Sequence, residues 1–325
     1  MKRRRLLLAS GACAALAATR ALAQSKALPR VALILSRPDA AGTLLEAFTA
    51  RLKELGYSEG RNVAIETRWF EGKVERLPEL ARELVASNPA VIVVVASPSA
   101  MALKNATRTI PVVFISVGNP DSQGFVASLA RPGGNMTGLS FRYESMEAKL
   151  MEAVRATLPA TRRVAVLDPV GDPAMIKLRP NIKAHFESMR FEAEFVPVKD
   201  ADDLARAIDE VARRKLDLLY AAPLALLLLN ARRIGELALA RRLVLVGPRR
   251  PFAEAGGLMS YDNDLKADFV AAARFVHRIL KGANPGDLPV EQPDRFQLVL
   301  NQRTAKALGI KFPQSLLVQA TEVIE

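Results

Sequence analysis

Cysteine and histidine are scarce in this chain. The single cysteine, Cys13, lies in an N-terminal segment that we expect to be removed. The remaining chain would then contain no cysteine, which excludes disulfides, thiol nucleophiles and thiolate metal sites. His185 and His277 lie far apart in the sequence, each within a predicted helix. Because no group of His, Asp and Glu has the spacing of metal ligands, we expect no metal and no cofactor.

The motifs of the common catalytic sites are also missing. The chain contains no G-x-S-x-G elbow, no P-loop and no G-x-G-x-x-G fingerprint. Its glycine-rich segment, Arg131 to Gly138, follows a predicted helix instead of leading from a strand into a helix, which is typical of turns. The apolar stretch from Leu218 to Leu229 is too short to span a bilayer and contains Pro223. These absences indicate a protein that is not an enzyme.

The first 23 residues have the three parts of a secretory signal peptide. Lys2 to Arg5 are positively charged, Leu6 to Ala18 are uncharged and mostly apolar, and Ala21 to Ala23 have the small-x-small pattern of a cleavage site. The apolar part is about 13 residues long, whereas a membrane span needs roughly 20. A cleaved signal is therefore favoured over an anchor, and we expect the mature protein in the periplasm.

Two other kinds of export signal fit less well. A lipoprotein signal would have Leu three residues before its acylated cysteine, whereas Ser10 stands three residues before Cys13. The run Arg3-Arg4-Arg5 is weakly similar to a twin-arginine signal. We favour the general secretory route, and the twin-arginine route stays open.

Positive charge exceeds negative charge, but it is not concentrated. The chain has 46 Lys and Arg against 34 Asp and Glu, and loss of the five basic side chains in the first 23 residues leaves 41 against 34, a net charge of +7. The remaining arginines occur as scattered pairs instead of one stripe. Nucleic-acid-binding proteins usually cluster their basic residues and interleave aromatic ones. We therefore expect a solvated basic surface and no nucleic-acid partner.

Short aliphatic runs alternate with amphipathic segments along the whole chain. The expected strands are at residues 31–35, 63–67, 91–95, 112–115, 164–167, 193–198, 216–220 and 243–246. The expected helices are at residues 43–55, 74–86, 174–189, 201–214, 226–241 and 265–280. This α/β alternation predicts doubly wound parallel sheets with helices on both faces. About 300 mature residues are long for a single core and suit two lobes.

Ligands of such sheets bind beyond the carboxyl ends of the strands. Polar or small residues follow most of the expected strands, and the loop at residues 255–262 precedes a helix. The candidate ligand-binding residues at these positions are Ser36, Arg37, Ser97, Pro98, Ser99, Asn119, Asp168, Tyr220, Tyr261 and Asp262. Ser97 to Ser99 lead into a helix, where free amides would hold a carboxylate or form an ordinary cap. Tyr261 is either a flat wall against the ligand or a core residue.

Several long segments make the chain recognisable. These signature segments are Arg131–Gly138, Phe252–Tyr261 and Leu288–Pro293. They resemble the substrate-binding proteins of an ABC transporter family that includes tryptophan/tyrosine-type binding proteins. The resemblance implies a type I periplasmic-binding-protein fold, in which three crossings join two lobes. It also implies that the protein closes over a small molecule and delivers it to a membrane permease.

The resemblance also implies how the chain divides between the lobes. After a signal peptide at 1–23, we expect residues 28–140 and 262–290 to form the N-terminal lobe. Residues 141–261 and 291–325 would then form the C-terminal lobe and the tail.

Three positions depart from the pattern of the family. The family often has Gly-Asp-Pro where this chain has Gly118-Asn119-Pro120, and often has Asp where Ala222 precedes Pro223. It often has Tyr-Gly where this chain has Tyr261-Asp262. Two carboxylates that could pair with a ligand ammonium group are therefore missing, and Asp262 adds one. We expect an organic acid, an aromatic ligand or an amino-acid-like ligand that is less cationic than an amino acid, with its carboxylate held at Ser97 and Ser99.

Alternatives of other classes remain. The protein could be the binding component of a sensory system, or an enzyme on a doubly wound fold. A sugar-responsive transcription regulator of the same fold would need a DNA-binding motif before the first strand, where the signal peptide lies.

Overall fold

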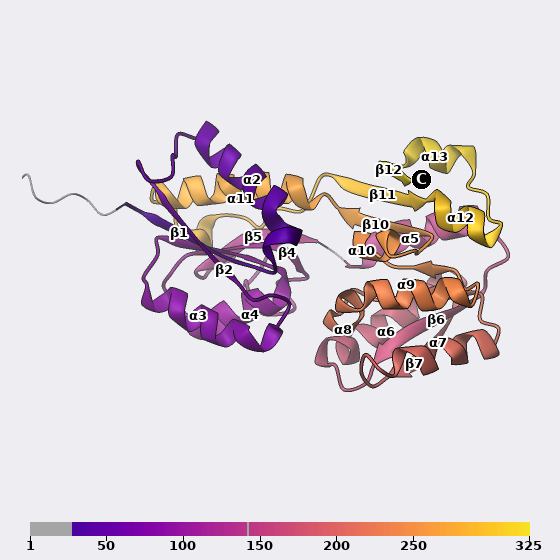
Figure 1. The fold of residues 1–325 in the computed structure, drawn as a ribbon. Helices are drawn as coiled ribbons and strands as arrows, with labels where there is room; N and C mark the ends of the chain where they lie inside the picture. Colours follow the sequence, from indigo (N-terminus) through magenta and orange to yellow (C-terminus); the bar gives the residue numbers. More distant parts are fainter. Residues whose placement is uncertain (1–27, 142) are drawn as a thin grey trace, which may run out of the picture.

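The computed structural model describes residues 28–141 and 143–325, so the expected signal peptide at 1–23 lies outside the described residues. Two α/β lobes lie side by side, and the chain passes between them more than once (Figure 1). Within the part of the chain that the structure describes, no helix is both long enough and apolar enough to cross a bilayer.

The N-terminal lobe is built on a five-stranded sheet in which every neighbouring pair is parallel. The strand order is β2-β1-β3-β4-β5. The strands are β1 (Arg30–Leu35), β2 (Ala64–Trp69), β3 (Val91–Val95), β4 (Val112–Gly118) and β5 (Met136–Phe141). The aliphatic runs of β1, β3 and β4 are almost wholly buried, as expected for parallel strands covered on both faces.

Helices cover both faces of this sheet. They are α2 (Pro38–Glu54), η1 (Val74–Arg76), α3 (Leu77–Ala86), α4 (Ala96–Ala106), α11 (Leu265–Leu280) and η2 (Pro285–Asp287). On one face, Val31 and Leu33 pack with Phe48 of α2 and Phe269 of α11. The other face packs against α3 and α4. The lobe therefore includes a helix from late in the sequence.

The C-terminal lobe has a seven-stranded sheet of order β12-β11-β10-β9-β8-β6-β7. The strands are β6 (Arg163–Pro169), β7 (Glu192–Val198), β8 (Leu218–Tyr220), β9 (Leu245–Val246), β10 (Met259–Asn263), β11 (Phe296–Asn301) and β12 (Glu322–Ile324). Only the β10–β11 pairing is antiparallel among the described pairings of this sheet.

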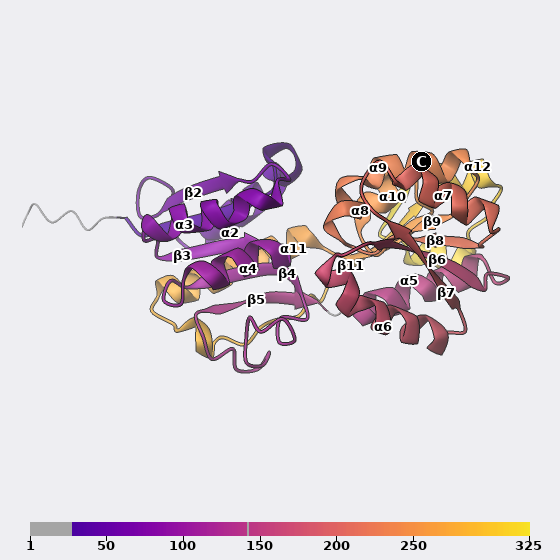
Figure 2. The same ribbon diagram turned by 90° about the horizontal axis from the view of Figure 1, so that it is seen from below.

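Helices also cover both faces of the second sheet (Figure 2). They are α5 (Tyr143–Thr157), α6 (Pro173–Ser188), α7 (Leu204–Arg213), α8 (Ala225–Leu229), α9 (Ala231–Ala240), α10 (Arg250–Glu254), α12 (Gln302–Leu308) and α13 (Gln314–Gln319). One face packs against α5, α6, α12 and α13, and the other against α7 to α10.

The chain crosses between the lobes three times. It passes from β5 into α5, from β10 into α11, and from the segment after η2 into β11. The last two crossings lie together, because the amide of Asp264 donates to the carbonyl of Arg295 over 3.0 Å. The third crossing also bridges to β5 through Leu139 and Glu291. We placed the return to the first lobe at residue 262, whereas Asp262 and Asn263 still pair with β11 in the second sheet.

Some expected loops are strands. The glycine-rich segment does not follow a helix, because residues 119–135 form turns and bends that lead into β5. Gly138 of β5 has φ of 146°, and a Cβ there would lie 2.0 Å from the carbonyl oxygen of Phe114. Glycine in this strand therefore marks a close backbone approach, not a turn. Likewise, the expected loop at 255–262 contains the first four residues of β10.

Candidate functional site

The carboxyl ends of strands in both sheets meet at one place, which we call the inter-lobe edge. Arg249, three residues beyond β9, donates from Nη1 to Ser116 Oγ of β4 over 3.2 Å. Gly72, which follows β2, lies close enough to α8 that a Cβ would be 3.3 Å from Leu229 Cδ2. The crossings from β5 and β10 also start from this edge. Residues at these strand ends thus lie between the two lobes.

Ser36 and Arg37 follow β1 at this edge. Ser36 is half-buried, and its carbonyl accepts a hydrogen bond of 2.6 Å from the amide of Glu71, which ties β1 to the end of β2. Arg37 is exposed and stands at the N-cap of α2 without capping it through its side chain.

Ser97, Pro98 and Ser99 lie in the first turn of α4, because the helix begins at Ala96 directly after β3. Ser99 is only 1% exposed, whereas Pro98 is exposed and has no amide hydrogen to offer a ligand. Ser97 Oγ accepts a hydrogen bond of 3.0 Å from Nε2 of Gln123. Gln123 is not among the candidates expected from the sequence, because its position beside α4 follows from a turn between β4 and β5.

A bulge in β4 shapes the next part of the edge. The register between β4 and β5 shifts between Phe114 and Val117, and Ser116 has a left-handed φ of 54°. A bulge re-aims side chains, and here the Ser116 hydroxyl meets Arg249 of the other lobe. Asn119 also has a positive φ, of 44°, and its backbone amide donates to the carbonyl of Phe141 over 3.1 Å.

Asp168 is the last residue but one of β6 and is 6% exposed. Its Oδ2 lies 2.6 Å from Nη2 of Arg179 in α6, whose guanidinium also covers the ring of Phe195 at 5.6 Å. The other oxygen, Oδ1, is buried and has no hydrogen-bond partner within the described residues. Asp168 therefore stands at the edge as one half of an ion pair.

Tyr220 lies behind the edge instead of facing it. Its side chain is 0% exposed, packs edge-on against Phe186 at 5.1 Å, and donates its hydroxyl hydrogen to the carboxylate of Glu147 in α5. This position differs from the expectation that Tyr220 contacts a ligand. The phenol satisfies a buried carboxylate in the core of the lobe.

Tyr261 and Asp262 are neighbours on β10 and point to opposite faces of the sheet. Tyr261 stacks on Phe296 with ring centroids 5.5 Å apart and an interplanar angle of 13°. Tyr261 packs against the hydrophobic cluster that includes side chains of α5. Burial raises the pKa of its phenol. Of the two roles expected for Tyr261, this placement favours a packing residue.

Asp262 points toward the loop that carries Arg249. Its Oδ2 lies 3.2 Å from Nε of Arg249 and accepts the amide hydrogen of Arg250 over 3.0 Å, while Oδ1 accepts the amide hydrogen of Asn263 over 2.8 Å. Burial raises the pKa of Asp262, and the Arg249 charge and the two backbone amides oppose this increase. Asp262 is therefore a buried carboxyl group that several donors hold.

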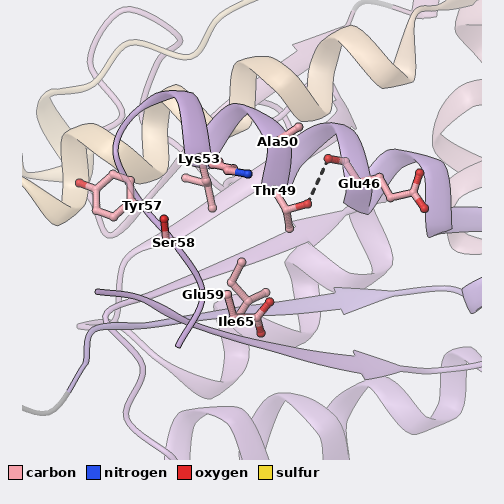
Figure 3. Close-up of a pocket in the computed structure, with 9 residues that line it drawn as sticks. Glu46, Thr49, Ala50, Lys53, Tyr57, Ser58, Glu59 and Ile65 are labelled. Atoms are coloured by element: carbon pink, nitrogen blue, oxygen red, sulfur yellow. Dashed lines mark hydrogen bonds between the residues drawn. The ribbon is translucent and has the colours of Figure 1, made fainter. Parts of the chain in front are cut away.

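Hollows are also present in parts of the described chain that the candidate residues do not line. One, of about 520 Å³, runs along α2 and is bordered by Glu46, Thr49, Lys53, Tyr57 and Ile65 (Figure 3). Tyr57 follows the end of α2, and this helix starts at the inter-lobe edge, so the hollow extends toward the opposite end of the sheet. A second hollow, of about 510 Å³, lies between α11 and the third crossing. Among the described residues, no group of three or more His, Cys, Asp and Glu could hold a metal ion.

Residues 30–324 match the family model described as "ABC transporter substrate binding protein". The chain belongs to this family. The resemblance predicted from the signature segments is thus confirmed, and the protein is a substrate-binding protein that binds a small molecule.

Individual relatives agree with this assignment. The chain is 24% identical over 266 residues to a tyrosine-binding protein of Clostridioides difficile (strain R20291), a match that covers 82% of this chain and 76% of the relative. Among solved structures, a conserved domain protein of Vibrio cholerae O1 biovar El Tor str. N16961 has a TM-score of 0.82 at 27% identity. A domain from Streptococcus pneumoniae, solved in complex with L-Trp, has a TM-score of 0.82 at 23% identity.

Both solved structures match 92% of this chain and 100% of their own. Together with the two parallel-sheet lobes and three crossings, this similarity confirms the predicted type I periplasmic-binding-protein fold.

Proposed function

We propose that this protein is exported to the periplasm, binds a small organic acid or an aromatic, amino-acid-like molecule at the inter-lobe edge, and delivers it to the permease of an ABC transporter. The observation that carries the proposal is the Arg249–Ser116 hydrogen bond, which brings the strand ends of both lobes within reach of one small molecule. A ligand that contacts both lobes would stabilise the closed arrangement over the open one. Solute-binding proteins of this family are not enzymes, and we assign no reaction to this chain.

The charges at the edge support a ligand without a dominant ammonium group. The two carboxylates among the candidate residues each have an arginine partner already, since Asp168 pairs with Arg179 and Asp262 with Arg249. Asn119 and Ala222 stand where relatives often have further carboxylates. The negative charge of each aspartate is therefore already balanced by a guanidinium, which weakens its attraction for an ammonium group.

The first α4 turn supports the same ligand class. Ser97 and Ser99 lie at the start of this helix, where backbone amides lack partners within the helix. An anionic group is favoured at such a position by the amides and by the helix dipole. We retain Ser97 and Ser99 as candidate ligand-binding residues at this helix start.

Identification of a bound molecule tests the proposal. The purified protein is denatured, the released small molecules are identified by mass spectrometry, and each is titrated back by calorimetry. We expect a single organic acid or aromatic compound that binds with 1:1 stoichiometry and is recovered unchanged. Chemical conversion of the compound, or binding of none, would contradict the proposal.

Export and delivery need their own measurements. N-terminal sequencing of protein from a periplasmic fraction should begin at Gln24. Uptake of the identified compound should fall in cells that lack this gene and recover when the full chain is restored. Normal uptake without the protein would contradict a role in transport.

A further inference from the structure

Arg249 holds an unusual position among the arginines of this chain. Its side chain is only 18% exposed, although it lies on a loop between β9 and α10. Its Nε faces Asp262 beside the second crossing, and its Nη1 donates to Ser116 in the other lobe. Arg249 therefore contacts both lobes next to the second crossing.

Most donors of this guanidinium are not used. The group carries five N–H donors, and among the described residues its side chain makes one hydrogen bond, to Ser116. The ion pair with Asp262 lies on the Nε side. Asp262 does not depend on Arg249 alone, because it also accepts the amide hydrogens of Arg250 and Asn263. The Nη side of Arg249 thus keeps donors for a second anion.

Neighbouring arginines do not share these properties. The side chain of Arg250 lies 2.8 Å from both carboxylate oxygens of Glu322 and also pairs with Glu254, all within the C-terminal lobe. Arg179 is 45% exposed and is paired with Asp168 while it covers Phe195. Each of these guanidiniums contacts one lobe only.

The conformation of Ser116 gives a second, independent observation. A left-handed φ of 54° is costly for a serine and persists only where the surroundings enforce it. The β4 bulge that contains Ser116 interrupts the pairing with β5. It places the Ser116 hydroxyl group where it accepts a hydrogen bond from Arg249 of the other lobe. Such strain is typical of ligand sites and moving joints.

We infer that Arg249 binds the carboxylate of the ligand through its free Nη donors and couples this binding to lobe closure through Ser116. The inference rests on the proposed function and adds the residue that selects an acidic ligand. A guanidinium suits this role, because its planar fork of donors matches the two oxygens of a carboxylate. The carboxylate would thereby be held beside the crossing around which the lobes move.

Three related probes test the inference. 3-(4-Hydroxyphenyl)propionate has a carboxylate and no ammonium group, tyramine has an ammonium group and no carboxylate, and L-tyrosine has both. Calorimetry should show that the propionate binds at least as tightly as L-tyrosine, and that tyramine does not bind. The R249Q variant should bind the propionate about 10- to 100-fold more weakly, the loss expected for a hydrogen-bonded charged group.

Matched variants distinguish an effect on ligand selection from an effect on folding. R250Q removes the adjacent guanidinium, which pairs with Glu322 and Glu254 within the C-terminal lobe, and should leave the affinity for the propionate unchanged. R249K keeps the charge but not the fork, so it should retain the preference for the propionate over tyramine with an intermediate loss of affinity. All variants are first compared by circular dichroism and thermal unfolding.

S116A tests the coupling to closure. It should weaken binding of the propionate by about 2- to 10-fold, since one neutral hydrogen-bond partner is lost. Small-angle X-ray scattering should show that saturating propionate compacts the wild-type protein more than S116A. Equal compaction of the two proteins would overturn the coupling.

The remaining outcomes distinguish the two proposals. If the protein binds tyramine or a neutral molecule, or if R249Q binds the propionate as tightly as the wild type, the role of Arg249 is overturned while the binding function stands. If neither these probes nor any co-purified molecule binds, both proposals fail.

Discussion

The side-chain amide of Asn263 donates a hydrogen bond to the carboxylate of Asp268, which joins the last residue of β10 to the first turn of α11. This bond spans the second crossing between the lobes. Asp268 is 3% exposed, and burial raises its pKa to about 7 although Asn263 and Arg249 oppose the increase. The crossing thus contains a carboxyl group that changes charge near neutral pH.

Stability should therefore depend on pH through Asp268. Because its folded pKa of about 7 lies above the ordinary value of 3.8, the group stabilises the fold fully at acidic pH and this contribution is lost as the pH rises to 7. The free energy of unfolding should fall by roughly 1 kcal/mol per pH unit between pH 5 and pH 7 from this group. Urea unfolding at pH 5, 6, 7 and 8 measures the slope.

The D268N variant is the test of that assignment. It should remove the contribution of Asp268, while Asp262, whose pKa burial also raises, contributes a slope of the same sign in both proteins. D294N changes an exposed aspartate on the third crossing and should keep the full slope. An unchanged slope in D268N would show that Asp268 is ionised throughout this range.

Two helical glycines should respond to alanine with opposite signs. A Cβ on Gly235 of α9 would lie 1.7 Å from the carbonyl oxygen of Ala255, so G235A forces α9 away from α10 and should cost about 1–3 kcal/mol. Gly42 of α2 has no atom within 4 Å of a built Cβ, so G42A should gain about 0.5–1 kcal/mol from helix propensity. Urea unfolding of the two variants measures both effects, and a loss in each would contradict this packing.

Substitution of Tyr220 distinguishes a role in the hydrophobic core from a role in ligand binding. The Y220F variant removes the donor to Glu147, which is 5% exposed, and should lower the free energy of unfolding by about 1–3 kcal/mol. Its affinity for the bound molecule should stay unchanged, because the Tyr220 side chain is wholly buried. Thermal unfolding and calorimetry give the two readouts. A loss of affinity with unchanged stability would show that Tyr220 contacts the ligand, contrary to this prediction.

The sequence predicted the elements whose hydrophobic pattern is unbroken. The predicted bounds of the strand Val91–Val95 agree with the structure at both ends, because a strand buried on both faces has a continuous aliphatic run. β5 and β10 were missed because their runs are interrupted by Gly138, Ser260 and Asp262. Gly138 is required by a close backbone approach, and Ser260 and Asp262 lie in the strand that leads into the second crossing. Neither requirement produces a periodic pattern in the sequence.

The site was predicted less completely than the fold. Strand ends indicate which edge of each sheet to consider, but contacts between distant residues decide which side chains face the other lobe. Arg249 and Arg250 look alike in sequence, yet one pairs with Asp262 and Ser116 while the other pairs with Glu322, 72 residues away. Ser116 lies within an aliphatic strand, and only the bulge turns its hydroxyl toward Arg249.

Trp69 should report directly on ligand binding. It is the single tryptophan of the sequence and the last residue of β2, so it lies at the inter-lobe edge in a half-buried position. Closure of the lobes should change the polarity around its indole, and saturating ligand should therefore shift or quench its emission. The W69F variant should lose this signal and still bind the ligand in calorimetry. Emission that stays constant during a titration that calorimetry records would mean that the C-terminal lobe closes without approaching β2.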